Sequence, residues 1–158
     1  MGRAADVGDD TGSRVIAARV VHTVMHLAFM IERRWPPYSK WFGTFFRTLE
    51  CAGEVGEAVD SALRAHDAAG RQSGIAAALE PLLRRQDALG LTAATRATIP
   101  FWDRPYLHPD PAIVAQLLDG IADPGVRALP RGRGSVEQRT DNVDVLVHAA
   151  ARRSAVSD

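Results

Sequence analysis

The chain has 158 residues, with 19 Lys+Arg balanced by 19 Asp+Glu and an apolar fraction of 46%. This length fits one ordinary domain, and the zero formal charge lacks the basic excess that nucleic-acid binders carry. Cys51 is the single cysteine, which excludes an internal disulfide and a thiolate cluster built by one chain. No apolar run approaches the roughly 20 residues of a membrane-spanning helix, so we expect a cytoplasmic protein with no membrane partner.

The two ends of the chain differ in composition from its middle. The first twelve residues are polar and acidic and include Gly2, Gly8 and Gly12. This composition predicts a disordered leader over residues 1–12, because it offers no apolar face to bury. We expect a helical domain over 13–150 and a frayed tail over 151–158.

Helical periodicity fills the first ninety residues. Apolar side chains recur at spacings of three and four, which is the pattern of amphipathic helices. Trp35-Pro36-Pro37 end the first helix, and Pro81 either kinks the fourth helix or opens a new helical segment. The predicted helices run over about 13–33, 41–49, 55–66 and 75–89.

The second half of the chain contains more proline and glycine. Periodicity is lost over 92–109, where three prolines predict an ordered loop. Asp110 and Pro111 have the pattern of an N-cap and a first helical residue, and the helix they open is expected to end near Ala122. A linker over 123–134 and a last helix from Ser135 follow. The fold class is therefore all-α, a single bundle of about five to seven helices with an ordered Pro/aromatic loop.

All ten aromatic residues fall in two short stretches. Seven lie between Phe29 and Phe46, and the other three are Phe101, Trp102 and Tyr106. Aromatic side chains interleaved with arginine on proline-stiffened backbone are typical of binding surfaces. The alternative is that they form the hydrophobic core with a solvated rim, and for Phe45 and Phe46 the two interpretations are about equally supported.

We predict that the Glu32–Thr44 segment and the Pro100–Tyr106 loop lie against each other and form the mouth of the principal pocket. The cations of both segments would supply hydrogen-bond donors to a carboxylate or phosphate. Asp103 would orient an arginine or receive a ligand amine or hydroxyl. The candidate ligand-binding residues are Arg33, Arg34, Tyr38, Lys40, Trp41, Trp102, Asp103, Arg104 and Tyr106.

A second polar feature runs along the first predicted helix as a narrow strip of Arg19, His22, His26 and Arg33. His22 and His26 are four residues apart, a spacing at which two imidazoles can share a metal ion. The neighbouring arginines would repel a cation, so a solvated edge and an anion-facing strip are the other interpretations. We expect no tightly bound metal. His66 falls on an apolar face and is expected in the core.

The residues give little support to catalysis by this chain alone. Gly134-Ser135 followed by Asp141 and Asp144 invites comparison with nucleotidyltransferases, whose paired aspartates hold Mg²⁺. That chemistry needs aspartates alternating on a strand, whereas these lie three apart in a segment of helical periodicity. Phosphate-binding glycine loops and Ser or Cys/His nucleophile motifs are also missing from the sequence. We therefore assign no catalytic residue and no cofactor.

Four strings stand out in the sequence: 32–44 (ERRWPPYSKWFGT), 89–92 (LGLT), 100–106 (PFWDRPY) and 134–138 (GSVEQ). Together they resemble the bacterial domain-of-unknown-function 4037 family. The resemblance covers about Arg14 to Leu146, and its first string is the most distinctive. In that family the helical region usually follows a nucleotidyltransferase-like domain, which the resemblance implies would carry metal and nucleotide. Only a dozen residues precede the first predicted helix here, so the resemblance implies the C-terminal part without its catalytic part.

The leading hypothesis is a non-catalytic helical binding module that recognises an anionic small molecule or a partner protein. The partner could be a separate nucleotidyltransferase-like chain. The rival hypothesis is an enzyme, either half of a split nucleotidyltransferase or a repurposed fold acting on a small molecule. A third is a truncated gene product without activity.

Overall fold

The computed structural model describes residues 1–129, 145 and 147–155. The chain divides into two compact units, Met1–Asp119 and Gly120–Asp158. Within its described residues the second unit contains α7 (Pro124–Arg127) and α10 (Ala149–Ala155). The predicted last helix from Ser135 lies outside the described residues up to position 144, and so do Asp141 and Asp144. Of its later residues the structure describes 145 and those from 147 onward.

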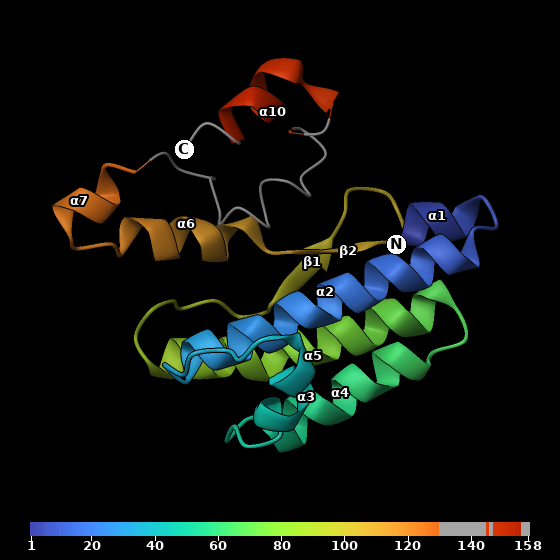
Figure 1. Ribbon diagram of the computed structural model, residues 1–158, viewed down its shortest axis with the longest axis horizontal. Coiled ribbons are helices and arrows are strands. Elements are labelled where there is room, and N and C mark those ends of the chain that lie inside the picture. The colour runs from blue at the N-terminus through green and yellow to red at the C-terminus, as the bar shows by residue number, and fades with distance from the viewer. Residues whose placement is uncertain (130–144, 146, 156–158) are drawn as a thin grey trace. The chain divides into compact units, whose positions relative to one another are not determined.

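The first unit is helical with one small hairpin, so the predicted all-α fold class is confirmed (Figure 1). The described residues hold eight helices, more than the five to seven expected, because α1 and α7 are too short to produce a periodic signal. The elements of the first unit are α1 (Gly2–Asp6), α2 (Asp10–Ile31), α3 (Ser39–Phe46), α4 (Ala52–Arg64), α5 (Ala68–Ala88), β1 (Thr98–Pro100), β2 (Leu107–Pro109) and α6 (Pro111–Asp119).

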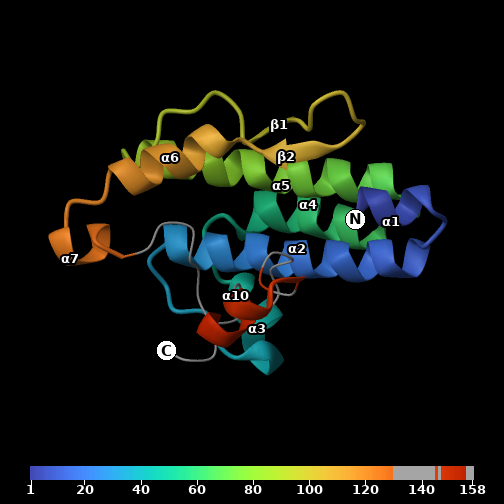
Figure 2. The same cartoon turned by 90° about the horizontal axis from the view of Figure 1, so that it is seen from above.

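The core is formed where α2, α4 and α5 lie side by side, as both ribbon views show (Figures 1 and 2). Phe29 of α2, Val55 of α4 and Leu82 of α5 are almost fully buried there. Gly74 permits the close approach of α5 to α4, because a Cβ at this position would lie 2.6 Å from the backbone nitrogen of Ala62. Pro81 is accommodated within a continuous α5.

Side-chain caps fix where the two long helices begin. The Asp9 carboxylate accepts a hydrogen bond of 2.7 Å from the Gly12 amide at the start of α2. Asp67 does the same for the Gly70 amide at the start of α5, also at 2.7 Å. These contacts satisfy amides that have no partner within the helix.

Several local expectations need correction. Residues 1–12, expected to form a disordered leader, contain α1 and the first turn of α2, because the Asp9 cap allows α2 to start three residues earlier than the apolar pattern suggests. The expected linker contains α7, which Asp123 caps by accepting from the Val126 amide at 2.9 Å. Most of the expected frayed tail belongs to α10. His66, expected in the core, is exposed because α4 ends at Arg64.

The composition of α2 corrects the expectation that no segment is long and apolar enough to cross a membrane. By length and composition this helix could cross a membrane, with a mean hydropathy of 1.4 over its most apolar stretch. Such a match is weak evidence, because a helix that contributes a buried face to a soluble core passes the same test. Here α2 buries Ala17, Val21, Val24 and Phe29 against the other core helices.

Candidate functional site

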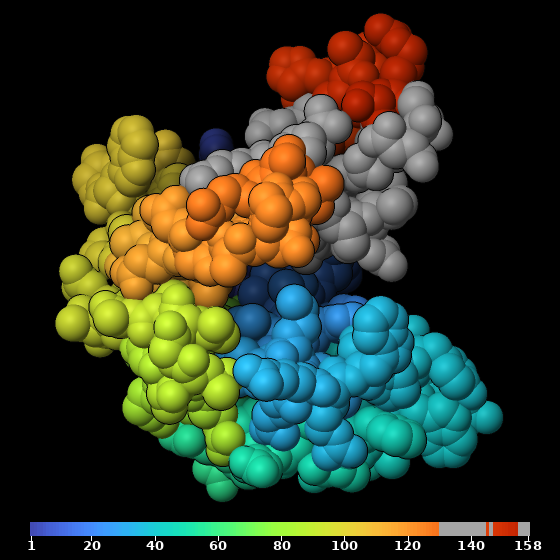
Figure 3. Space-filling model, turned by 90° about the vertical axis from the view of Figure 1, so that its left-hand side faces the viewer, coloured from blue at the N-terminus to red at the C-terminus, as the bar shows by residue number. Residues whose placement is uncertain are grey.

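The segment that follows α2 forms an exposed aromatic and basic surface, here called the 33–47 surface. Figure 3 shows these residues, coloured light blue to cyan, at the face of the molecule turned to the viewer. The chain leaves the helix through Arg33, whose φ of 53° places a non-glycine residue in the left-handed region. Its exposed aromatic and basic residues are Arg33, Arg34, Trp35, Tyr38, Lys40, Trp41, Phe45 and Arg47.

The aromatic residues of this segment divide between core and surface. Phe42 and Phe46 are buried members of the core, in agreement with the core interpretation for Phe46. Trp35 is 92% exposed and Tyr38 is 69% exposed, and Phe45 also faces solvent. The short helix α3 therefore packs one face on the bundle and presents the other outward.

Contacts within the surface order its side chains. The Trp41 indole Nε1–H donates to the Tyr38 hydroxyl oxygen at 2.9 Å. The Lys40 ammonium lies 5.2 Å from the centre of the Trp41 ring, within the range of a cation–π interaction. Arg34 donates to the Thr48 carbonyl oxygen at 3.2 Å. These contacts reduce the conformational freedom that binding would otherwise remove.

Glu32 joins the end of α2 to the beginning of α4. Its carboxylate accepts hydrogen bonds from the backbone amides of Glu50 at 2.9 Å and Cys51 at 2.8 Å. Burial raises the pKa of this carboxyl, but the hydrogen bonds from Cys51 and Glu50 outweigh burial and leave the pKa below its ordinary value. Burial first, and then the nearby Glu32 carboxylate, raise the pKa of the Cys51 thiol to about 12. The thiol is therefore a poor nucleophile at neutral pH.

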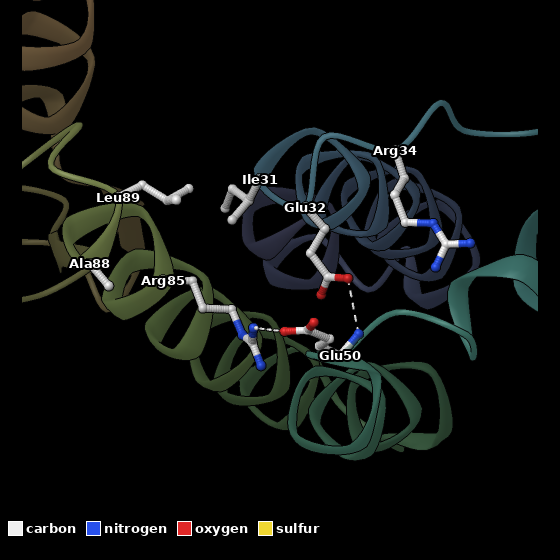
Figure 4. Close-up of a pocket in the computed structure, with 7 residues that line it drawn as sticks. All are labelled: Ile31, Glu32, Arg34, Glu50, Arg85, Ala88 and Leu89. Atoms are coloured by element: carbon white, nitrogen blue, oxygen red, sulfur yellow. Dashed lines mark hydrogen bonds and ion pairs between the residues drawn. The ribbon is translucent and has the colours of Figure 1, made fainter.

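A pocket of about 370 Å³ lies beside Glu32 (Figure 4). The Arg85 guanidinium pairs with the Glu50 carboxylate at 3.6 Å, and Glu32 faces Glu50 (Figure 4). The pocket therefore contains two carboxylates and two guanidinium groups. Its lining residues are Ile31, Glu32, Arg34, Glu50, Arg85, Ala88 and Leu89.

The predicted loop forms a hairpin. β1 and β2 pair antiparallel, with Ile99 opposite His108, and residues 101–106 make the turn. Trp102 at the turn is 87% exposed and has a φ of 60°. Asp103 and Arg104 beside it are also exposed.

The prediction that the Glu32–Thr44 segment and the Pro100–Tyr106 loop share a pocket is wrong. The Gln72 side chain of α5 holds the hairpin by donating to the Pro105 carbonyl at 3.3 Å and accepting from the Leu107 amide at 2.9 Å. The Tyr106 hydroxyl donates to the carboxylate of Asp6, the last residue of α1, and this bond is the main cause of a raised Tyr106 pKa. Arg85, which lines the pocket, is thirteen residues further along α5, or about 20 Å at the helical rise.

The structure therefore separates the candidate residues into two groups. Arg33, Arg34, Tyr38, Lys40 and Trp41 stay together on the 33–47 surface. Trp102, Asp103, Arg104 and Tyr106 belong to the hairpin. Sequence reasoning missed Glu50 and Arg85 as pocket residues, because Glu50 lies in the turn between α3 and α4, Arg85 is an ordinary charged position of α5, and neither belongs to a local motif.

The histidine strip on α2 is partly covered by α3. The His22 and His26 ring centres are 4.6 Å apart, and the Phe42 ring stacks on both, at 4.6 Å and 4.9 Å. Arg19 and His22 remain exposed, and His26 is half-buried. Among the described residues no group of three or more His, Cys, Asp or Glu side chains could hold a metal ion. The strip thus has the character of a packed edge that is open to solvent at one side.

Comparison with known proteins gives one match. The model of the family described as a domain of unknown function, DUF4037, matches residues 1–42. No curated protein and no solved structure matches the chain. The match begins at Met1, ahead of the Arg14 start expected from the sequence, and it ends before the strings at 89–92, 100–106 and 134–138. The similarity to the DUF4037 family therefore covers residues 1–42, which run from α1 into α3 and include most of the 33–47 surface.

Proposed function

We propose that this chain is a non-catalytic binding module that engages a partner protein through the 33–47 surface. The observation that carries the proposal is the exposure of Trp35, Tyr38, Trp41 and Phe45 within one short segment. Aromatic and arginine side chains dominate the binding energy of protein interfaces because they bury a large area with few rotatable bonds. Covering exposed apolar side chains of this size with a partner would remove apolar surface from water, which favours binding.

A protein partner explains the site better than an anionic small molecule does. In the pocket, Arg85 already pairs with Glu50, and the Arg34 guanidinium donates to the Thr48 carbonyl. An anion entering the pocket would also meet the carboxylates of Glu32 and Glu50. The negative charges of these two carboxylates oppose the binding of an anion.

Catalysis by the described residues has little support. The Cys51 thiol is buried and its pKa is raised to about 12, so it is not an activated nucleophile. The His22 and His26 rings stack on the ring of Phe42. The proposal therefore assigns recognition, and no chemical step, to this part of the chain.

Site-specific photo-crosslinking in the cells that produce the protein tests the proposal. A photoreactive phenylalanine analogue in place of Tyr38 should give one predominant protein adduct, and the same analogue at exposed Leu63 on α4 should not. The double variant Trp35→Ala/Trp41→Ala should weaken binding of the purified partner by about ten-fold or more, the scale of one lost interface anchor. Equal adducts from Tyr38 and Leu63 would contradict the proposal.

The same experiment separates the remaining alternatives. Trp102→Ala is the matched control, because Trp102 is as exposed as Trp35 but belongs to the hairpin. Its partner affinity should equal that of the unsubstituted protein. A crosslinked partner with alternating aspartates on a strand, active only in the complex, would favour the split nucleotidyltransferase. Binding of inorganic phosphate that Arg85→Ala abolishes would favour a small-molecule site.

A further inference from the structure

The 33–47 surface carries positive charge without any compensating carboxylate in its own segment. Residues 33–47 include Arg33, Arg34, Lys40 and Arg47 and no Asp or Glu. The whole chain is neutral, so this local excess departs from its overall composition. A local excess of one sign attracts a partner surface of the opposite sign and speeds its association.

Several arginines elsewhere in the first unit pair with carboxylates. Among the described residues five such ion pairs are formed, whereas Arg33, Lys40 and Arg47 form none. The paired arginines are satisfied within the fold. Arg33, Lys40 and Arg47 therefore keep their donors available to a partner. The five pairs are Arg14–Asp10, Arg64–Asp60, Arg71–Asp10, Arg84–Glu54 and Arg85–Glu50.

We propose that the 33–47 surface binds an acidic segment of the partner protein, which places carboxylates on Arg33, Lys40 and Arg47 and apolar side chains on Trp35 and Trp41. This inference rests on the proposed function and specifies the chemistry of its partner. Guanidinium and ammonium groups bind carboxylates through short, charge-assisted hydrogen bonds. The exposed indole rings beside them exclude water from those bonds, which strengthens them.

An acidic protein segment fits this surface better than an anionic membrane does. Membrane binding by an interfacial helix scales with the apolar area that it buries in the lipid. α3 has eight residues and already buries Phe42 and Phe46 in the core. Its outer face retains Trp41 and Phe45 between polar positions, and the Trp41 N–H is occupied by Tyr38. A protein interface, in contrast, needs only a few such anchors.

Fluorescence anisotropy with the purified full chain tests the proposal. The probes are a labelled short peptide of alternating glutamate and leucine and its counterpart with glutamine in place of glutamate. We expect the glutamate peptide to bind at least about ten-fold more tightly, and its affinity to fall as salt is added. Equal affinity for the two peptides, or no binding of the glutamate peptide, would overturn the acidic assignment.

Charge-reversal variants locate the binding. Lys40→Glu should weaken binding of the glutamate peptide by about ten-fold or more, while an acidic residue in the first turn of α3 suits the helix dipole and preserves the fold. Arg96→Glu changes the net charge by the same amount at an exposed residue outside the surface, and it should leave the affinity unchanged. Equal losses in the two variants would reduce the effect to net charge and overturn the proposal.

Two further outcomes identify other occupants. Binding to phosphatidylserine vesicles that Trp35→Ala abolishes, with no peptide binding, would replace the acidic segment by a membrane. Concentration-dependent dimerisation that Lys40→Glu abolishes would replace it by a second copy of the chain. The proposed function fails separately, because a partner crosslinked at Tyr38 whose binding ignores Lys40→Glu would contradict only the acidic chemistry.

Discussion

Arg71 of α5 is buried to 1% exposure and pairs with the carboxylate of Asp10, the first residue of α2. The same guanidinium donates to the Ser13 hydroxyl at 3.0 Å and to the Ala65 carbonyl at 3.4 Å. Its Nε is a buried polar atom without a partner among the described residues. The pair therefore ties the starts of two core helices together at the end of the bundle away from the pocket.

Removing Asp10 and removing Arg71 should have different effects on the stability of the fold. Asp10→Ala leaves a buried guanidinium without its countercharge, so we expect a clear fall in Tm. Arg71→Met removes the buried charge while largely keeping its volume, and the half-exposed Asp10 keeps Arg14 as a partner. We expect Arg71→Met to change the free energy of unfolding by only about 1 kcal/mol. Thermal unfolding of both variants tests this, with Asp60→Ala in the exposed Arg64 pair as the control.

The Asp10 effect should also depend on pH. Hydrogen bonds from Arg14 and Arg71 hold the pKa of Asp10 below its ordinary value of 3.8, so the folded state favours the carboxylate. The resulting stabilisation is fully present above that ordinary value and is lost as pH falls through the lower folded pKa. The Tm difference between the unsubstituted protein and Asp10→Ala should thus be constant near neutral pH and shrink only below about pH 4. A difference that fades between neutral pH and about pH 5 would assign the effect to another group.

The close contact at Gly74 gives a sharper packing prediction. Gly74→Ala places a methyl group against the backbone of Ala62, so α4 and α5 must separate, at a cost of about 1–3 kcal/mol. Gly53→Ala in α4 meets nothing within 4 Å and should stabilise the helix slightly. Urea unfolding of the two variants checks the contrast. Similar effects at both positions would show that the helices are not held in this contact.

The local sequence predicts most of the helical core, but it does not predict the burial of Arg71 or the hairpin. The apolar spacing that includes Val55 and Val59 predicts α4 because the helical period alone determines which face is buried. The burial of Arg71 could not be predicted from the local sequence, since a charged residue is expected at the surface and its burial depends on Asp10, sixty-one residues away. The hairpin was missed because Pro100 and Pro109 were interpreted as breakers, although both sit at strand ends where proline is tolerated.

The candidate site could likewise be predicted only in part. The proline-stiffened segment and its exposed aromatics could be found from composition, and the 33–47 surface overlaps the predicted Glu32–Thr44 segment and extends past it to Arg47. The distance between this surface and the hairpin could not be predicted, because Arg34 lines the pocket beside Arg85 of α5 whereas the hairpin is held by Gln72 near the other end of that helix. Gln72 and Arg85 belong to the same helix, and nothing in the local sequence says that one holds the hairpin and the other lines the pocket.

Glu32 should stabilise the start of α4 without being part of that helix. Glu32→Ala removes the acceptor for the Cys51 and Glu50 amides, and loss of such a cap costs on the order of 1 kcal/mol. Glu32→Gln retains a carbonyl acceptor and should lose less. Chemical denaturation compares the two. If both variants were as stable as the unsubstituted protein, the carboxylate would not act as a cap.

Cys51 should resist thiol reagents while the protein is folded. Burial and the Glu32 carboxylate raise the thiol pKa to about 12, so the reactive thiolate is scarce near pH 8. Alkylation by iodoacetamide should therefore proceed only at the rate of unfolding and become fast in denaturant. Glu32→Gln removes one cause of the raised pKa and should speed the reaction of the folded protein modestly. Rapid alkylation of the folded chain would contradict the burial of this thiol.

The left-handed backbone at Arg33 predicts opposite effects on stability and binding. An L-residue with a side chain loses roughly 1 kcal/mol or more in this region, a cost that glycine avoids. Arg33→Gly should consequently raise Tm or leave it unchanged, although glycine also adds freedom to the unfolded chain. The same substitution removes one of the cations proposed to contact the acidic segment, so affinity for the glutamate peptide should fall. Arg34→Gly is the matched control, because Arg34 lies outside the left-handed region and can only lose stability. A fall in Tm for Arg33→Gly as large as for Arg34→Gly would show that the arginine side chain stabilises the turn, and the strain at Arg33 would then have no link to binding.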